Sequence, residues 1–247
     1  MGDRILVTSP ISAVLLMLGA VAWFVTFYLS RKMNDMAATM SLGAFLGIWT
    51  TMMSAMMLPA VAPVATAYQR MIRSDRLVRV PLFAASYLSV WAVAGLPLYL
   101  LADLIPGQMS QRASTTVAVG ILVACGAYQW SPAKARCLKH CRSPMSLLLR
   151  YSAYRGRFRD VAAGAHHGAY CLGCCWTLFT LLLVFGMMNV AAMLVLAVIV
   201  VLEKGWSRGE TLSRVVGTAC LALALAAVFM PPLAASLMMQ GTGMGGM

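Results

Sequence analysis

Charged side chains are scarce in this sequence, and acidic ones are the scarcest. Asp, Glu, Lys and Arg make up only 11% of its 247 residues, and only 7 residues are acidic. Soluble domains are about one quarter charged. Hydrophobic residues instead account for 61% of the chain, and the mean hydropathy is +0.82. This composition excludes a soluble globular domain and favours a membrane protein.

The common enzyme motifs are also missing. The sequence contains no Gly-rich phosphate loop, no Gly-x-Ser-x-Gly elbow and no His-Glu-x-x-His pair. Carboxylates are nearly absent from the apolar segments, and a proton-coupled pump normally needs such groups. No A-x-A-like cleavage site follows the first apolar run, so we expect that run to be a retained span. These absences favour a non-catalytic membrane protein.

Six apolar segments are long enough to cross a bilayer. A spanning helix needs about 20 apolar residues, and lipid allows only helices or closed barrels. The segments are continuous rather than alternating, which favours helices. The expected spans are roughly 5–29, 41–68, 82–104, 114–130, 169–202 and 214–238. The whole chain, 1–247, is therefore predicted to be one all-α polytopic domain of about six helices, the fifth of which Gly186 or Asn189 could break.

Basic residues are concentrated in two loops, and the net charge is +12. One loop runs from Arg70 to Arg79, and the other is the longer segment 131–168, where short amphipathic helices are expected at the membrane surface. The positive-inside rule places both loops, and with six spans both termini, in the cytoplasm of a bacterial inner membrane. The charge is thus explained by the lipid bilayer as a partner, and nucleic acid is not expected.

Seven cysteines occur, an odd number that argues against a disulfide framework. Cys137 and Cys141 lie four residues apart and share a face if this piece is helical. Paired thiolates suit Zn²⁺ or Cu(I), and the neighbouring Arg136 and Lys139 favour the ionised form. Two surface thiols without a ligand are the plain alternative.

A denser cluster begins at the fifth span. His167, Cys171, Cys174 and Cys175 fall at positions i, i+4, i+7 and i+8, which places them along one stripe of a continuous helix. This pattern predicts a metal or redox role. With Cys137 or Cys141 the cluster could complete one soft-metal site at the cytoplasmic face. That hypothesis requires the sulfurs of the two clusters to approach within roughly 4 Å of one another.

Methionines in the second span form another candidate site. Met52 and Met56 are four residues apart, as are Met53 and Met57, so each pair lies on one face of a helix. Thioethers are soft ligands that suit Cu(I). Methionine is also an adaptable core residue, so packing is the alternative explanation. We take Met52 and Met56 as the candidate ligands.

The order of several motifs resembles a known bacterial family. The motifs are Met52-Met53-Ser54-Ala55-Met56-Met57-Leu58-Pro59, Tyr128-Gln129-Trp130-Ser131-Pro132-Ala133-Lys134 followed by Cys137, Cys141-Arg142 and Pro144, Cys171-Leu172-Gly173-Cys174-Cys175-Trp176, Gly186-Met187-Met188-Asn189, and Glu203-Lys204. Together they resemble the predicted metal-binding integral membrane proteins, a family of unknown function. The resemblance covers roughly residues 42–204 and implies a bound metal without naming it.

Three interpretations follow from these patterns. The first is a membrane protein that handles a soft metal, with Cu(I) favoured and Zn possible, by storage, transfer or delivery to a membrane metalloenzyme. The second is a non-catalytic accessory subunit that packs against other membrane subunits through small residues and methionines. The third is a thiol redox protein that uses Cys174 and Cys175 with Cys137 or Cys141.

Overall fold

The computed structural model describes residues 10–32, 41–72, 75–104, 111–142, 158–186 and 189–229, and these ranges contain helices and no strands. The helices are α1 Pro10–Lys32, α2 Leu42–Met71, α3 Arg76–Leu104, α4 Gln111–Trp130, α5 Pro132–Arg142, α7 Arg159–Phe185, α8 Val190–Gly205 and α9 Gly209–Phe229. The all-α prediction is therefore confirmed over the described residues.

Five of the described helices are long and apolar enough to cross a membrane. They are α1, α2, α3, α7 and α9. The apolar part of α4 is shorter, at Thr115–Trp130, and α8 has only 16 residues. The predicted count of six spans is therefore not confirmed, although a membrane-type helical bundle is.

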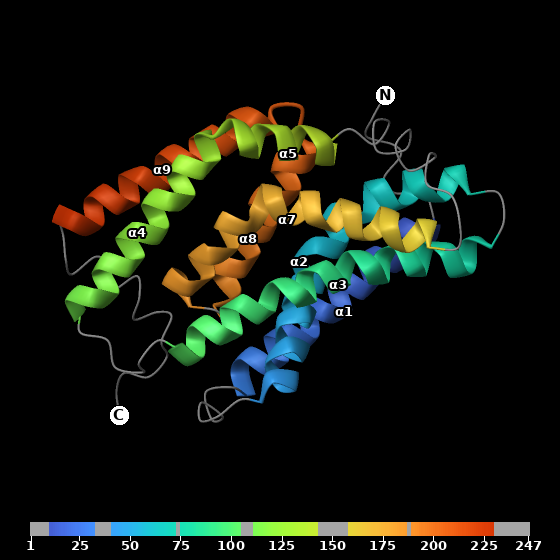
Figure 1. Ribbon diagram of the computed structural model, residues 1–247, viewed down its shortest axis with the longest axis horizontal. Coiled ribbons are helices and arrows are strands. Elements are labelled where there is room, and N and C mark those ends of the chain that lie inside the picture. Colours follow the sequence, from blue (N-terminus) through green and yellow to red (C-terminus); the bar gives the residue numbers. More distant parts are fainter. Residues whose placement is uncertain are drawn as a thin grey trace.

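Helix α7 occupies the centre of the bundle. It packs against α3 on one side and against α4 and α5 on the other, while α1 pairs with α2 and α4 pairs with α9. Figure 1 shows the α4–α9 pair on one side of the molecule, α1, α2 and α3 on the other, and α7 and α8 between them. Of the five long helices, α7 is also the most buried. Side chains on α7 can therefore meet partners from both sides of the bundle.

The predicted fifth span, 169–202, begins earlier than expected and forms two helices, with the break at one of the two residues that the sequence suggested for it. Helix α7 begins at Arg159 and ends at Phe185, and α8 follows as a separate helix. The chain breaks at Gly186, whose φ of 93° is a conformation that side chains other than glycine rarely adopt. Asn189 then caps α8, because its side-chain oxygen accepts a hydrogen bond from the Ala192 amide at 3.0 Å. The polar amide is thus satisfied locally rather than by another span.

Part of the basic segment 131–168 is helical. Its first residues form α5, and its last residues, from Arg159 onward, form the start of α7. Arg142 at the end of α5 donates hydrogen bonds to the carbonyls of Trp206 and Ser207, at 2.5 and 2.8 Å, and so fixes α5 to the turn before α9. Residues 143–157 lie outside the described residues, as do both chain termini, for which a cytoplasmic location is predicted.

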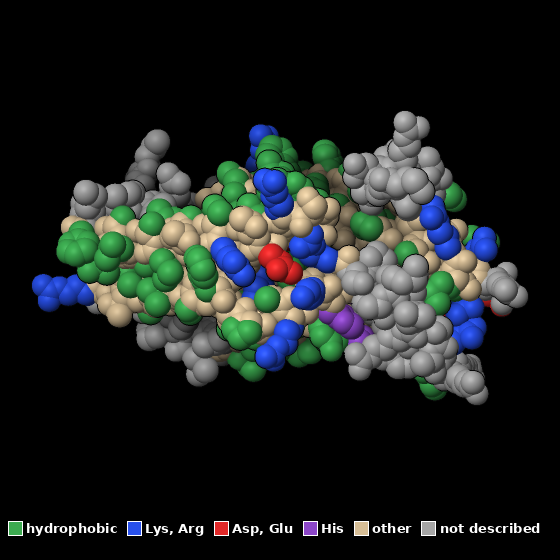
Figure 2. Space-filling view, turned by 90° about the horizontal axis from the view of Figure 1, so that it is seen from above, with side chains coloured by type: hydrophobic (Ala, Val, Ile, Leu, Met, Phe, Trp, Pro, Cys, Tyr) green, Lys and Arg blue, Asp and Glu red, His purple; other side chains and the backbone are tan. Residues whose placement is uncertain are grey.

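Exposed basic side chains gather over α5 and the start of α9. Figure 2 shows Lys and Arg side chains grouped on this face, and the exposed ones on these two helices are Arg136, Lys139 and Arg214, with Arg208 just before α9. A cluster of this kind is typical of a surface that meets anionic lipid head groups.

Candidate metal centre

The cysteine stripe of α7 points into the protein interior. Cys171, Cys174 and Cys175 are each 0% exposed, and His167, one turn earlier, is 3% exposed. The helical periodicity places them on the buried face of α7, where α2, α3, α5 and α8 can supply neighbours. Polar, reactive groups in this position need partners, and the contacts around each one identify them.

Sulfur atoms lie close together around this stripe. The Cys174 and Cys175 Sγ atoms are 3.1 Å apart, beyond the S–S bond length of about 2.05 Å, and both are free thiols. The Cys171 Sγ lies 3.8 Å from the Sδ of Met57 on α2. With metal–sulfur bonds of about 2.3 Å, two sulfurs held 120° apart around one ion are about 4.0 Å apart. The Cys171–Met57 separation is therefore suited to a shared soft metal ion.

Helix α5 brings both of its cysteines to the same region. The buried Cys141 side chain interacts with the Cys174 thiol. Cys137 packs against the backbone of α7 beside Gly173, where a Cβ on that glycine would lie only 3.2 Å from the Cys137 Sγ. The two clusters that the sequence suggested thus lie side by side, with Cys141 in contact with the stripe and Cys137 at its edge.

Two polar side chains that sequence reasoning did not select contact Cys171. The Tyr87 hydroxyl on α3 is 3.0 Å from the Cys171 Sγ, and the Lys204 Nζ on α8 donates a hydrogen bond to this sulfur at 2.8 Å. Hydrogen-bond donors and a positive charge both stabilise a thiolate. Cys171 is therefore the sulfur of the stripe that contacts both a cation and a hydroxyl group. The Glu203-Lys204 motif was the only sequence signal for Lys204, and Tyr87 had none.

His167 lies beside the cysteines in an aromatic enclosure. Its ring stacks on Tyr87 and Phe83, with ring centroids 5.7 and 6.2 Å away. Among the described residues its Nδ1 atom has no hydrogen-bond partner. A buried imidazole nitrogen without a hydrogen-bond partner costs free energy. The same nitrogen is available to bind a metal ion. His167 thus fits the ligand role that the sequence predicted for it.

A buried ion pair between α5 and α8 contacts the backbone of the stripe. The Lys134 Nζ lies 2.7 Å from the Glu203 Oε2, both side chains are 1% exposed, and the same Nζ donates to the Cys174 carbonyl at 2.6 Å. Burial lowers the pKa of Lys134, but the Glu203 carboxylate and the nearby thiols outweigh this effect, so the net pKa lies above that of an ordinary lysine. The ammonium therefore persists at neutral pH and fixes α5 and α8 to the backbone of Cys174.

The candidate methionines of α2, which are Met52, Met53, Met56 and Met57, are all buried, but they do not all face the stripe. Met57 contacts Cys171, whereas Met56 lines a separate hollow together with Trp23 and Leu194. Successive residues on a helix point in different directions, so Met53 and Met57 share one face while Met52 and Met56 share another. The structure therefore places Met57 at the cluster, where the sequence analysis had selected Met52 and Met56.

The donor set determines which metal can bind. Among the described residues, no three or more His, Cys, Asp or Glu side chains form a ready-made metal site. Methionine is not one of those four residue types, and the close sulfur contacts here include one. The Cys171 thiol lies beside the Met57 thioether, and the Cys174 and Cys175 thiols lie beside each other. Thiols and a thioether are soft ligands, so this donor set matches a soft metal ion and does not match hard cations.

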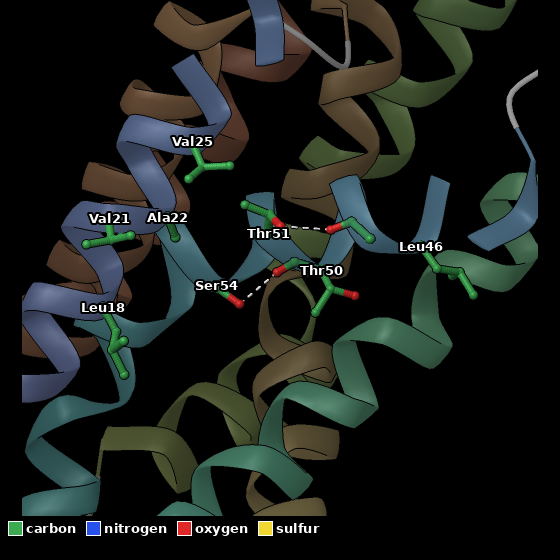
Figure 3. Close-up of a pocket in the computed structure, with 9 residues that line it drawn as sticks. Leu18, Val21, Ala22, Val25, Leu46, Thr50, Thr51 and Ser54 are labelled. Carbon is green, nitrogen blue, oxygen red and sulfur yellow. Dashed lines mark hydrogen bonds between the residues drawn. The ribbon is translucent and has the colours of Figure 1, made fainter. Parts of the chain in front are cut away.

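A hollow of about 630 Å³ between α1 and α2 has different chemistry. Figure 3 shows its lining of aliphatic side chains with three hydroxyl-bearing residues, Thr50, Thr51 and Ser54. Thr51 and Ser54 donate hydrogen bonds to carbonyls of their own helix, at 2.8 and 2.7 Å. The Thr51 and Ser54 hydroxyls are therefore already used within α2. The soft ligands lie instead around α7.

The fold and the site together define a helical, membrane-type protein with a buried cluster of soft ligands. The chain belongs to the PpoB2 copper chaperone family, whose model matches residues 46–227. The matched region contains the methionines of α2 and every cysteine of the chain. Membership of this family supports a copper-handling role. No curated protein and no solved structure matches the chain significantly.

Proposed function

We propose that this protein is a copper chaperone of the bacterial inner membrane that holds Cu(I) at the α7 stripe. The proposed ligands are Cys171, Cys174 and Cys175, with Met57 from α2 and with Cys141 and His167 at the edge. The observation that carries the proposal is the Cys171 thiol, which is buried, contacts Met57, accepts a hydrogen bond from the Lys204 ammonium and is hydrogen-bonded to the Tyr87 hydroxyl. Family membership supports copper as the cargo.

Cargo transfer in this scheme needs no redox chemistry. Cu(I) binds the Cys171 sulfur in place of the Lys204 ammonium, which stays protonated beside the site. Each further thiol that becomes a ligand releases one proton as Cu(I) enters, and no electron is transferred. Release reverses these steps when the acceptor offers competing soft ligands. The proposed acceptor is a membrane metalloenzyme, and the surrounding bilayer is the protein's permanent partner.

The two basic segments meet at one end of the bundle, which supports a common cytoplasmic side for both. Arg79 of α3 forms an ion pair with Asp160 at the start of α7, with 2.9 Å between the Nη2 and Oδ1 atoms, and Tyr68 of α2 donates a hydrogen bond to the same carboxylate. The positive-inside rule then places this end in the cytoplasm. A cysteine introduced at Arg76 should accordingly react with a membrane-impermeant thiol reagent only in inverted membrane vesicles, and labelling in intact spheroplasts would contradict this orientation.

Cu(I) binding to the purified protein tests the proposed function. Replacing Cys171, Cys174 and Cys175 together by Ser should weaken the high-affinity Cu(I) site by at least about a hundredfold, since outer-shell changes alone can cost 10–100-fold. Affinity is measured anaerobically by competition with a coloured Cu(I) chelator. Circular dichroism and gel filtration in detergent confirm that the variant is folded. A folded variant with wild-type affinity, or a wild type isolated with these thiols in disulfides, would overturn the proposal.

The choice of methionine can be tested with a matched pair of variants. Met57→Leu should weaken Cu(I) affinity by about tenfold or more, because it removes the thioether beside Cys171 and keeps the volume. Met56→Leu should change affinity less than about twofold, because this side chain lies away from the cysteines. The opposite order would assign the thioether role to Met56, as the sequence analysis suggested.

A further inference from the structure

Two further cysteines form a pair that the proposed copper site does not use. Cys125 on α4 and Cys220 on α9 lie 95 residues apart in the sequence, yet their Sγ atoms are only 3.9 Å apart. They are 0% and 5% exposed. Both are free thiols. Thiols in an apolar helix interface lack strong hydrogen-bond partners, so this pairing requires an explanation from the packing or from a ligand.

The backbone packing of α4 and α9 fixes this separation. Gly126 follows Cys125, and a Cβ on it would lie 2.9 Å from the Gly217 carbonyl oxygen and 2.6 Å from Leu221. A Cβ on Gly217 would likewise lie 3.0 Å from the Gly126 carbonyl oxygen. The two helices therefore meet backbone to backbone, as small residues allow in membrane proteins. The thiols of Cys125 and Cys220 are held in place by this rigid contact.

A third polar group faces the pair from α7. The Thr177 side chain interacts with the Cys125 thiol, and this threonine is 1% exposed. Its hydroxyl has no hydrogen-bond partner of normal geometry among the described residues. Thr177 lies three residues after Cys174, which is about one turn along the same helix. Thr177 therefore connects the Cys125–Cys220 pair to the helix that carries the stripe.

We propose that Cys125 and Cys220 form a second Cu(I) site between α4 and α9. The sulfur separation of 3.9 Å agrees with the value of about 4.0 Å for two sulfurs at 120° around an ion with bonds of about 2.3 Å. Two thiolates and one hydroxyl are too few good ligands for tetrahedral zinc, and their softness favours Cu(I). The site would thus hold a single soft ion of low coordination number.

Copper reaches this pair by ligand exchange, a step that rests on the proposed function of the stripe. Bonds from Cu(I) to Cys171, Cys174, Cys175 and Met57 break as bonds to Cys125 and Cys220 form. Two thiol protons move from Cys125 and Cys220 to Cys174 and Cys175, while the Cys171 sulfur returns to its contact with the Lys204 ammonium. Charge is therefore conserved and no electron is transferred. The α4–α9 pair then holds the ion on the far side of α7 from the methionines of α2.

Copper stoichiometry in four proteins separates the two sites. The wild type should bind about two Cu(I) per chain, as two groups of soft ligands predict. The Cys125→Ser/Cys220→Ser variant and the Cys171→Ser/Cys174→Ser/Cys175→Ser variant should each bind about one, and the combined variant should bind none. Cu(I) is titrated anaerobically in detergent, and X-ray absorption of the stripe variant should show sulfur ligands on its remaining copper.

The outcomes distinguish the two proposals. If Cys125→Ser/Cys220→Ser binds as much Cu(I) as the wild type, the second site is wrong while the stripe proposal survives. If Cys125→Ser/Cys220→Ser loses copper and Cys171→Ser/Cys174→Ser/Cys175→Ser binds as much as the wild type, the stripe proposal is wrong and the second site stands. Cys220→Ala alone provides a smaller change if the double variant misfolds, and it should also remove about one Cu(I). A disulfide between Cys125 and Cys220 in protein purified under reducing conditions would overturn the site.

Discussion

Replacing Lys134 by Met should lower the free energy of unfolding by about 3–5 kcal/mol, the usual cost of removing one partner of a buried ion pair. The change leaves the Glu203 carboxylate 1% exposed and without its cation. It also removes the hydrogen bond from the ammonium to the Cys174 carbonyl. Gln129 is a weak substitute partner, because its amide lies 3.4 Å from the Glu203 Oε1 and its own oxygen already accepts a hydrogen bond from Ser213.

Thermal unfolding in detergent measures this effect directly. The cysteines described here are mostly buried, so a dye that becomes fluorescent on reacting with thiols reports the loss of packing. Lys139→Met on the same helix is the matched control, because Lys139 is exposed and its replacement removes the same charge. The double variant Lys134→Met/Glu203→Gln should recover most of the loss, since no buried charge then remains. Equal stability of Lys134→Met and Lys139→Met would show that the ion pair does not stabilise the fold.

The five longest helices could be predicted from the sequence because each one is a long apolar run. Lipid leaves the backbone of such a run few alternatives to a helix. The helix boundaries were less predictable, as the fifth predicted span shows, because the sequence left open whether 169–202 is one helix or two. Helix α7 ends just before Gly186, whose φ is positive, although the composition on both sides of it is apolar. Hydropathy alone therefore joins two helices that the chain separates.

The site could be predicted only where its residues are neighbours in the sequence. His167, Cys171, Cys174 and Cys175 form a stripe because one helix has a fixed period. Lys204 and Tyr87 reach Cys171 from 33 and 84 residues away, and this depends on how three helices pack. The same limit explains the methionines, since spacing gave two equivalent pairs and only the packing of α2 against α7 identifies Met57.

Gly164→Ala should lower the free energy of unfolding by about 1–3 kcal/mol, the usual cost of adding a group to a full interior, and should also weaken Cu(I) binding. A Cβ at this position of α7 would lie 2.2 Å from the Phe83 carbonyl oxygen and 2.0 Å from the Ser86 Oγ. The serine side chain can rotate away, but the carbonyl belongs to the backbone of α3. Helices α3 and α7 must therefore separate to accept the methyl group.

That separation would also change the candidate metal centre, because α3 carries Tyr87 and α7 carries Cys171. The Tyr87 hydroxyl oxygen and the Cys171 Sγ are 3.0 Å apart. Gly120→Ala on α4 is the matched control, since a Cβ there meets nothing within 4 Å. In an exposed helix this change removes the cost of glycine and should stabilise the protein by up to about 1 kcal/mol. Unfolding curves and Cu(I) competition on both variants test the pair. If Gly164→Ala matched Gly120→Ala in both measurements, the close approach of α3 and α7 would not be what holds Tyr87 against Cys171.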